Sequence, residues 1–310
     1  MKQIRGKKMI ALATVFIILA IILLYLSVEL ILCNNAVKQA YKRLEAYNAQ
    51  SIELSSGKMT YVDSGNGEVL FVVHGICGGY DTIDMLKDKQ NDYRIIVPSR
   101  FGYLGSNLPS DTSPSNQVSA FIELLDKLNI DKVFLFGTSA GGTIAIKFAL
   151  EHPERVKGLI LYSTAAPFVE KPSSYPKYAG VPKFLTNDFG LWLCRHFFKP
   201  MMGMDTQMIH SMLPIKERRA GMINDAAVNN IDMAKNFDDY PIETLKVKTL
   251  IAQAKDDKMA DYNQIANSVS RFPNCKFLVF ETGGHLLENN PELNVAFADF
   301  IVENSYKENL

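Results

Sequence analysis

The longest apolar run in the chain lies near its N-terminus. Every residue from position 9 to position 26 is apolar except Thr14 and Tyr25, and the run continues more weakly to Leu32. As a helix, residues 9–32 would span about 36 Å at roughly 1.5 Å per residue, which is enough for a bilayer core of roughly 30 Å. We therefore predict a membrane anchor over residues 1–33. A buried helix of a soluble domain can also be apolar on every side, but such a helix is rare at the extreme N-terminus.

A cleaved signal peptide is the main alternative to this anchor. Basic residues precede the apolar run, as they do in a signal peptide: Lys2, Arg5, Lys7 and Lys8. Against cleavage, the run is long and no site of the small-x-small kind closes it. The bulky Leu32 before Cys33 also disfavours a lipoprotein signal.

The basic residues that flank the apolar run predict its orientation. Four precede it, and three follow it: Lys38, Lys42 and Arg43. Because basic residues accumulate on the cytoplasmic side, we expect a cytoplasmic N-terminus and the rest of the chain outside. Residues 34–50 are mostly polar and predict a helical stalk between the anchor and a folded domain.

From residue 51 onward, short apolar runs alternate with amphipathic ones. Residues 51–55 and 58–63 alternate like a β-hairpin, with Ser56 and Gly57 at the turn. The apolar runs at residues 69–73 and 94–97 predict strands buried on both faces. Further strands are predicted at residues 132–136, 156–163 and 247–253. Another strand is expected at 276–280, and helices at 113–128, 141–151, 261–272 and after Pro291. This alternation is typical of a mostly parallel sheet flanked by helices, the α/β class, over residues 51–310.

The alternation stops between residues 166 and 240. This stretch contains six prolines and, between Met201 and Met233, seven methionines, so its helices should be short. We interpret residues 167–240 as a helical cap inserted into one α/β domain. Trp192 and Phe198 are candidates to contact a substrate, although aromatic residues in such a segment more often form its own core.

Composition excludes several classes of function. The 310 residues include 33 Lys plus Arg and 33 Asp plus Glu, so the formal net charge is zero and there is no electrostatic case for binding nucleic acid. The four cysteines include no CxxC pair, which predicts neither a metal site nor a disulfide framework. A single bridge between Cys194 and Cys275 stays open if the domain is exported.

The motif with most chemical content is Gly137-Thr138-Ser139-Ala140-Gly141. It matches G-x-S-x-G and lies between a predicted strand and a predicted helix, the context in which this motif presents a nucleophilic serine. Flanking glycines allow the tight turn, and the following helix N-terminus favours developing negative charge. We therefore predict Ser139 as a nucleophile.

A serine nucleophile needs a neighbouring base, and His285 is the best candidate. It follows Gly283 and Gly284, directly after the last predicted strand. His152 suits the end of a helix, and His74 is expected to be structural. The two remaining histidines, His196 and His210, lie in the predicted cap, where they are expected to pack, lie at the surface or contact substrate.

The acid that would orient His285 should follow a strand that lies between Ser139 and His285 in sequence. Asp256 and Asp257 both follow the strand at 247–253. We favour Asp257, with Asp256 as the alternative, because spacing alone does not decide between them. The strand at 156–163 ends without a carboxylate, which removes another common location for the acid.

Two backbone amides are candidates to bind an oxyanion. One is that of Ala140, which follows the nucleophile. The other should come from the glycine-rich loop at residues 74–79, where we assign the Ile76 amide and place that of Cys77 second. Such a donor typically contributes about 10²–10³ in rate. Cys77 is also a candidate substrate contact or a small apolar filler.

Together these motifs resemble the α/β-hydrolase superfamily. The HG-x-x-G loop at His74 to Gly78, the elbow at Ser139 and Gly284-His285 occur in the superfamily's order, and the resemblance covers about residues 52–166 and 242–302. Residues 99–106 are similar to a D-x-R-G-x-G-x-S segment, with Ser99 in place of aspartate and an extra Phe101. This similarity implies that Arg100 braces loops around the site.

The resemblance implies acyl transfer by a Ser–His–Asp triad without a cofactor or a metal. The expected small-molecule acyl substrate is a carboxylic ester, and a lipid-like ester would suit a site next to a membrane. Serine in the elbow argues against the dehalogenases and epoxide hydrolases that resemble this chain but use aspartate. C–C hydrolases, peptidases and perhydrolases share the frame, and a slow or non-catalytic ligand receptor is the alternative of another class. The sequence predicts no particular oligomeric state.

Overall fold

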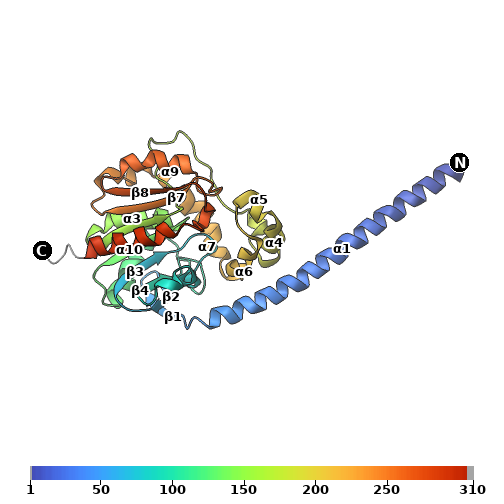
Figure 1. Cartoon of the computed structure of the whole chain (residues 1–310). Helices are drawn as coiled ribbons and strands as arrows, with labels where there is room; N and C mark the ends of the chain where they lie inside the picture. The colour runs from blue at the N-terminus through green and yellow to red at the C-terminus, as the bar shows by residue number, and fades with distance from the viewer. Residues whose placement is uncertain (1, 306–310) are drawn as a thin grey trace.

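The N-terminal helix stands apart from the body of the protein (Figure 1). The structure is a computed structural model that describes the backbone of residues 2–305 and the side chains of residues 8–305. Helix α1 (Lys2–Glu45) is continuous, so no break in the helix separates the predicted anchor from the predicted stalk. Its apolar part is long enough to cross a membrane and is not buried in the protein. Residue 1 of the anchor and residues 306–310 of the folded domain lie outside the described residues.

The body is built on an eight-stranded sheet in the order β1-β2-β4-β3-β5-β6-β7-β8. Strands β1 and β2 pair antiparallel, as do β2 and β4, and all other neighbours are parallel. The strands are β1 (Gln50–Leu54), β2 (Gly57–Ser64), β3 (Glu68–Val73), β4 (Tyr93–Pro98), β5 (Val133–Thr138), β6 (Val156–Tyr162), β7 (Thr249–Ala254) and β8 (Cys275–Phe280). The mostly parallel sheet is therefore confirmed.

The first hairpin turns one residue earlier than predicted. Leu54 pairs with Gly57, so the two turn residues are Ser55 and Ser56, and Gly57 already belongs to β2. Gly57 has a φ of 102°, a conformation that glycine adopts without steric cost.

Helices cover both faces of the sheet, and strand residues alternate between them. Phe71 and Val73 face a core formed with α2 (Pro114–Lys127), α3 (Gly141–Glu151) and α9 (Tyr262–Ser268). Leu70 and Val72 face the other core, formed with the 3-10 segment Tyr80–Lys89 and α10 (Pro291–Ser305). Helix α2 begins as predicted: Ser113 caps it by accepting a hydrogen bond from the Asn116 amide.

The segment between β6 and β7 forms the cap. Its helices are short, as the prolines and methionines predict, and 3-10 turns link several of them. They are α4 (Asp188–Cys194), α5 (Phe198–Met202), α6 (Ile209–Met212), α7 (Arg219–Asn224) and α8 (Asn230–Lys235). Helices α4, α5 and α6 lie between the body and α1 (Figure 1).

A buried ion pair joins the cap to the body. The guanidinium of Arg100, two residues after β4, contacts both carboxylate oxygens of Asp225 in the cap at 2.6 Å. The hydroxyl of Tyr103 and the side-chain amide of Asn229 also donate to Asp225. A second pair joins Arg218 of the cap to Asp81. Because each charge is paired and hydrogen-bonded, the pairs hold the two parts in one register.

The C-terminal half of α1 packs against the cap, and its last turn packs against the body. Residues at helical spacing are buried on one face: Glu29, Cys33, Ala36, Ala40 and Leu44. The Glu29 carboxylate accepts hydrogen bonds from the Trp192 indole at 2.7 Å and from Arg195 at 2.8 Å. The predicted stalk is thus part of the packed structure, not a free spacer, and its last residue, Gln50, begins β1.

The cysteines are all free thiols, including Cys194 and Cys275. The bridge that the sequence left open is therefore not formed. Cys33 and Cys77 are buried in the apolar cluster between α1 and the cap.

Replacing Arg100 by glutamine should destabilise the protein strongly. The change leaves the buried Asp225 carboxylate without its cation, a loss typically worth about 3–5 kcal/mol. The measurement is the free energy of unfolding of the full chain in urea, in one detergent. Lys255→Gln, which removes an exposed pair with Glu281, is the control and should change stability little. Equal stabilities of the two variants would contradict the assigned role of Arg100.

Candidate active site

Ser139 lies on a tight turn between β5 and α3. Its φ is 51°, in the left-handed region that a non-glycine residue adopts at a cost. A Cβ on Gly141 would lie 2.1 Å from the Val73 carbonyl oxygen, so only glycine allows α3 to begin this close to β3. The turn therefore has the geometry expected of a nucleophile elbow.

His285 reaches Ser139 from the loop after β8. Its Nε2 lies 2.9 Å from the Ser139 Oγ. Gly283 and Gly284, which precede it, have φ values of 130° and 58°, so the loop uses the conformational freedom of glycine to turn back towards β5. The two residues are 146 positions apart in sequence and are brought together by the parallel sheet.

Asp257 is the carboxylate that contacts His285. Its Oδ2 lies 2.9 Å and its Oδ1 3.1 Å from the His285 Nδ1. With the proton on Nδ1, His285 donates to Asp257, and Nε2 is free to accept from Ser139. Asp256 points elsewhere: its Oδ1 accepts a hydrogen bond from the Gly284 amide at 2.8 Å. Of the two candidates, the structure thus brings Asp257 to the histidine.

The surroundings of Asp257 favour its ionised form. Burial opposes the charge, but hydrogen bonds from His285 and from the amides of Met259 and Ala260 outweigh it and lower the pKa of the carboxyl. The side-chain amide of Gln253 donates to Oδ2 at 3.0 Å and was not anticipated from the sequence. A fixed carboxylate of this kind holds an imidazole in one tautomer and stabilises its protonated form.

The glycine-rich loop after β3 lies against the nucleophile. A Cβ on Gly75 would be 2.7 Å from that of Ser139. The Gly78 amide donates to the Gly75 carbonyl, and Cys77 adopts a φ of 61° to close this turn. Among the described residues, no hydrogen bond uses the amide of Ile76 or that of Ala140. Both amides therefore stay available as the predicted oxyanion donors.

His74 and Arg100 hold this loop from behind. The buried His74 ring contacts the Gly75 carbonyl through Nδ1 at 2.7 Å and accepts the Arg100 amide through Nε2 at 3.0 Å. Burial and the nearby Arg100 charge lower the pKa of His74, so the ring is neutral, as this pattern requires. Arg100 also donates to the His74 carbonyl at 2.8 Å. Both residues thus have structural contacts, in the positions that the sequence indicated.

The three candidate substrate contacts lie together in one apolar cluster. Cys77, Trp192 and Phe198 are all buried there with residues of α1. The Cys77 Sγ lies 3.7 Å from the Met222 Sδ. Trp192 donates to Glu29, and the Arg195 guanidinium stacks 4.0 Å from its ring. Packing within the cap and against α1 therefore accounts for the burial of Trp192 and Phe198 without a substrate.

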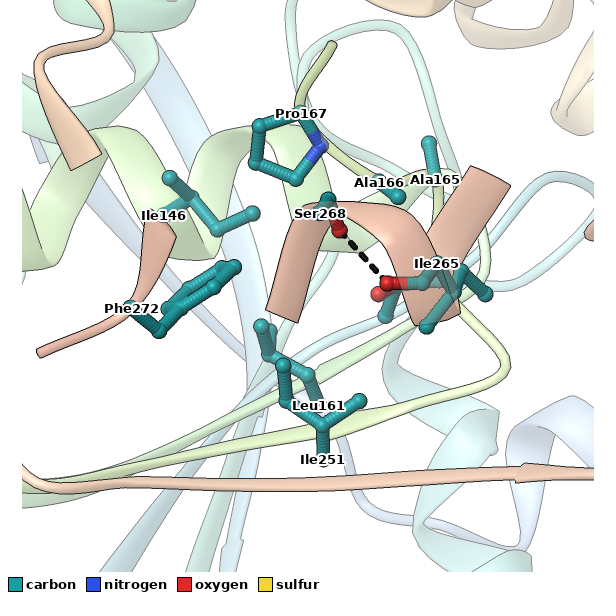
Figure 2. Close-up of a pocket in the computed structure, with 10 residues that line it drawn as sticks. Ile146, Leu161, Ala165, Ala166, Pro167, Ile251, Ile265, Ser268 and Phe272 are labelled. Carbon is teal, nitrogen blue, oxygen red and sulfur yellow. Dashed lines mark hydrogen bonds between the residues drawn. The ribbon is translucent and has the colours of Figure 1, made fainter. Parts of the chain in front are cut away.

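A small apolar hollow lies where the segment that follows β6 passes between α3 and α9 (Figure 2). It is lined by Ile146, Leu161, Thr164, Ala165, Ala166, Pro167, Ile251, Ile265, Ser268 and Phe272. None of Ser139, His285 and Asp257 borders it, and the Ser268 hydroxyl beside it is satisfied by the Ile265 carbonyl. We interpret it as a gap in the packing between α3 and α9, not as the substrate site.

Sequence comparison finds relatives of several hydrolytic activities. Lipase 3 of Moraxella sp. strain TA144 is 32% identical over 44% of this chain, and the match spans only 42% of that lipase. Lipase 1 of Psychrobacter immobilis is 24% identical over 76% of this chain and 78% of its own. A 2-hydroxy-6-oxononadienedioate/2-hydroxy-6-oxononatrienedioate hydrolase of Paraburkholderia phymatum is 26% identical over 79% and 91%.

Solved structures share the fold at low sequence identity. An esterase from Exiguobacterium antarcticum aligns with a TM-score of 0.67 and 22% identity, over 81% of this chain and 98% of its own. A membrane phospholipase A aligns with a TM-score of 0.64 and 16% identity, over 97% of this chain and 99% of its own. Since α1 has 44 residues, the second alignment includes most of it.

A family model described as the alpha/beta hydrolase fold matches residues 68–287, which is more than half of the chain. This match includes the elbow, the acid and the histidine described above. The sheet order, the cap between β6 and β7 and the solved relatives agree with it. The chain therefore belongs to the α/β-hydrolase family.

Proposed function

We propose that this protein is a membrane-anchored serine hydrolase that cleaves a carboxylic ester through an acyl-enzyme. The observation that carries the proposal is the continuous hydrogen-bonded chain from the Ser139 Oγ through His285 to Asp257. The chain of contacts starts at a strained turn and ends at a buried, ionised carboxylate. This is the arrangement that activates a serine hydroxyl.

The reaction would proceed in two halves. His285 takes the Ser139 proton through Nε2 as Oγ attacks the ester carbonyl, and Asp257 stabilises the imidazolium that forms. The amides of Ile76 and Ala140 would hold the oxyanion of the tetrahedral intermediate. His285 then gives the proton to the leaving alcohol, and a water molecule, activated in the same way, releases the acid from Ser139. No cofactor takes part in this scheme.

Several observations favour an ester of lipid-like character. The cap is rich in apolar residues next to the loop at residues 74–79. The apolar helix α1 would hold the site beside a bilayer. Relatives named as lipases and a structural neighbour named as a membrane phospholipase A are consistent with such a substrate.

The anchoring and its direction are part of the proposal. The apolar part of α1 would cross the membrane once, with the N-terminus in the cytoplasm and the catalytic domain outside. Four basic residues precede the span and three follow it, and this difference sets the proposed direction.

A C–C bond hydrolase is the second candidate. The relative from Paraburkholderia phymatum, which is named as a dienedioate hydrolase, matches most of both chains. The same fold and triad can support ester hydrolysis and C–C bond hydrolysis, so the triad alone does not distinguish the two reactions.

The direct test is ester hydrolysis by the full chain in detergent. We expect wild type to cleave p-nitrophenyl esters, with the optimum acyl length indicating the room under the cap. Ser139→Ala should lose essentially all of this activity, because it removes the attacking oxygen. If folded wild type cleaves no ester and a fluorophosphonate leaves Ser139 unlabelled, the proposal is wrong. Cleavage of a dienedioate in place of any ester would move the second candidate to the front.

Asp257 and Asp256 form a matched pair for testing the acid. Asp257→Asn should lower kcat by about 10⁴, because the histidine loses the carboxylate that fixes its tautomer. Asp256→Asn keeps an oxygen for the Gly284 amide and should leave most activity. Steady-state kinetics of both variants with one p-nitrophenyl ester provide the comparison. A larger loss in Asp256→Asn would reverse the assignment.

A further inference from the structure

Part of the cap exposes large apolar side chains to solvent. Phe184 is 78% exposed, Phe197 60% and Met201 70%. Phe197 and Met201 are four residues apart across the start of α5 and so lie on one helical face. Phe184 lies in the 3-10 turn Lys183–Leu185, which packs beside α4. We call these three residues the apolar cap surface.

The apolar cap surface is tied in place beside α1. His196, which precedes Phe197, lies 3.5 Å from the Tyr25 hydroxyl and 3.4 Å from the Glu29 carboxylate. Arg195 donates to the same carboxylate at 2.8 Å. The turn Arg195–Phe197 is therefore fixed at the level of Tyr25 and Glu29 along the helix.

That level coincides with the edge of the predicted membrane span. A bilayer core of roughly 30 Å takes about 20 helical residues, so a span that begins at Met9 ends near Val28. Tyr25 and Glu29 then lie at the membrane–water interface, where a tyrosine is favoured. Phe197, next to His196, is at the same height. Helix α4 packs against α1, and α5 lies on the side of the cap that faces the N-terminal part of α1 (Figure 1).

Charge around the apolar cap surface is complementary to an anionic membrane. Lys183 and Lys199 are exposed, and each lies within two residues of an exposed phenylalanine. Between residues 171 and 205 the chain has five basic residues and two acidic residues, Asp188 and the exposed Asp205. Lys171 and Arg195 are paired with carboxylates, whereas Lys183 lies over the Tyr178 ring and keeps its full charge. Lys183 and Lys199 can therefore meet headgroups.

We infer that the cap docks on the bilayer that α1 enters, with Phe184, Phe197 and Met201 in the interface. The occupant of this surface is the lipid of the leaflet from which α1 emerges, and Lys183 and Lys199 contact its headgroups. The inference rests on the membrane attachment in the proposed function. Exposed aromatic and aliphatic side chains beside basic ones are typical of surfaces that lie in a membrane interface.

Depth measurement tests this inference without using catalysis. The full chain, with Cys194→Ser and Cys275→Ser, carries one added cysteine labelled with an environment-sensitive fluorophore. It is reconstituted in vesicles of phosphatidylethanolamine and phosphatidylglycerol, with or without nitroxide quenchers on the acyl chains. We expect quenching for labels at Phe197→Cys and Met201→Cys. Val295→Cys on α10, 62% exposed and packed on the body, is the matched control and should stay unquenched.

A label at Leu19→Cys in α1 separates the two ways in which the inference can fail. If Leu19 is unquenched, α1 does not enter the bilayer, and the proposed attachment fails together with the docking. If Leu19 is quenched but the labels at 197 and 201 behave like that at 295, only the docking is wrong. A blue shift at 197 that depends on the protein-to-lipid ratio without quenching would assign the surface to a second copy of the chain and overturn the inference.

Activity gives an independent readout. Phe197→Asp combined with Met201→Asp should leave hydrolysis of a soluble p-nitrophenyl ester unchanged, because neither residue belongs to the triad or the predicted oxyanion site. Hydrolysis of a lipid ester in vesicles should fall at least about tenfold, because apolar contact with the bilayer is lost. Val295→Asp is the control and should change neither rate. Equal effects on the soluble and the vesicle-bound substrate would contradict the docking.

Discussion

The buried guanidinium of Arg100 is the constraint on which the arrangement of the site depends. It donates to the His74 carbonyl on one side and to the Asp225 carboxylate of the cap on the other. Since a buried charge without its partners is costly, the loop after β3 and the cap hold each other in place. The turn at Gly75, which lies against Ser139, is thereby fixed from behind. The elbow itself needs no such support, because strand β5 and helix α3 are both buried in the core.

The cap is held at two ends by different chemistry. Asp225 and Arg218 tie it to the body, and Glu29 ties it to α1 through Trp192 and Arg195. A rotation of the cap would have to break a buried ion pair at one end or the hydrogen bonds to α1 at the other. The cap and α1 are therefore held as one packed unit, and a tilt of α1 relative to the body would strain the buried ion pairs of the cap.

The sequence predicted those features whose signal is local. Apolar runs located the strands, and the G-x-S-x-G turn and the Gly284-His285 pair identified two members of the hydrogen-bonded chain. The choice between Asp256 and Asp257 could not be made from spacing, because it depends on which of two adjacent side chains faces the histidine loop. The partners Asp225 and Glu29 were missed because their contacts are 125 and 163 residues away in sequence. The sequence did contain a signal for Glu29, because this carboxylate interrupts the apolar run that continues to Leu32.

The apolar cluster between α1 and the cap also reaches the predicted oxyanion loop. Cys77 is a member of that cluster, and the Ile76 side chain packs against it. The backbone that would stabilise the oxyanion thus has side chains embedded in the same packed unit as Trp192 and α1. Because packed cores shift between discrete arrangements and do not deform continuously, a displacement of the cap would change the position of the Ile76 amide. A shift of α1 would therefore reach the predicted oxyanion loop through this packing and also through a polar chain, because Arg43 of α1 contacts Asp81, whose partner Arg218 donates to the Gly78 carbonyl.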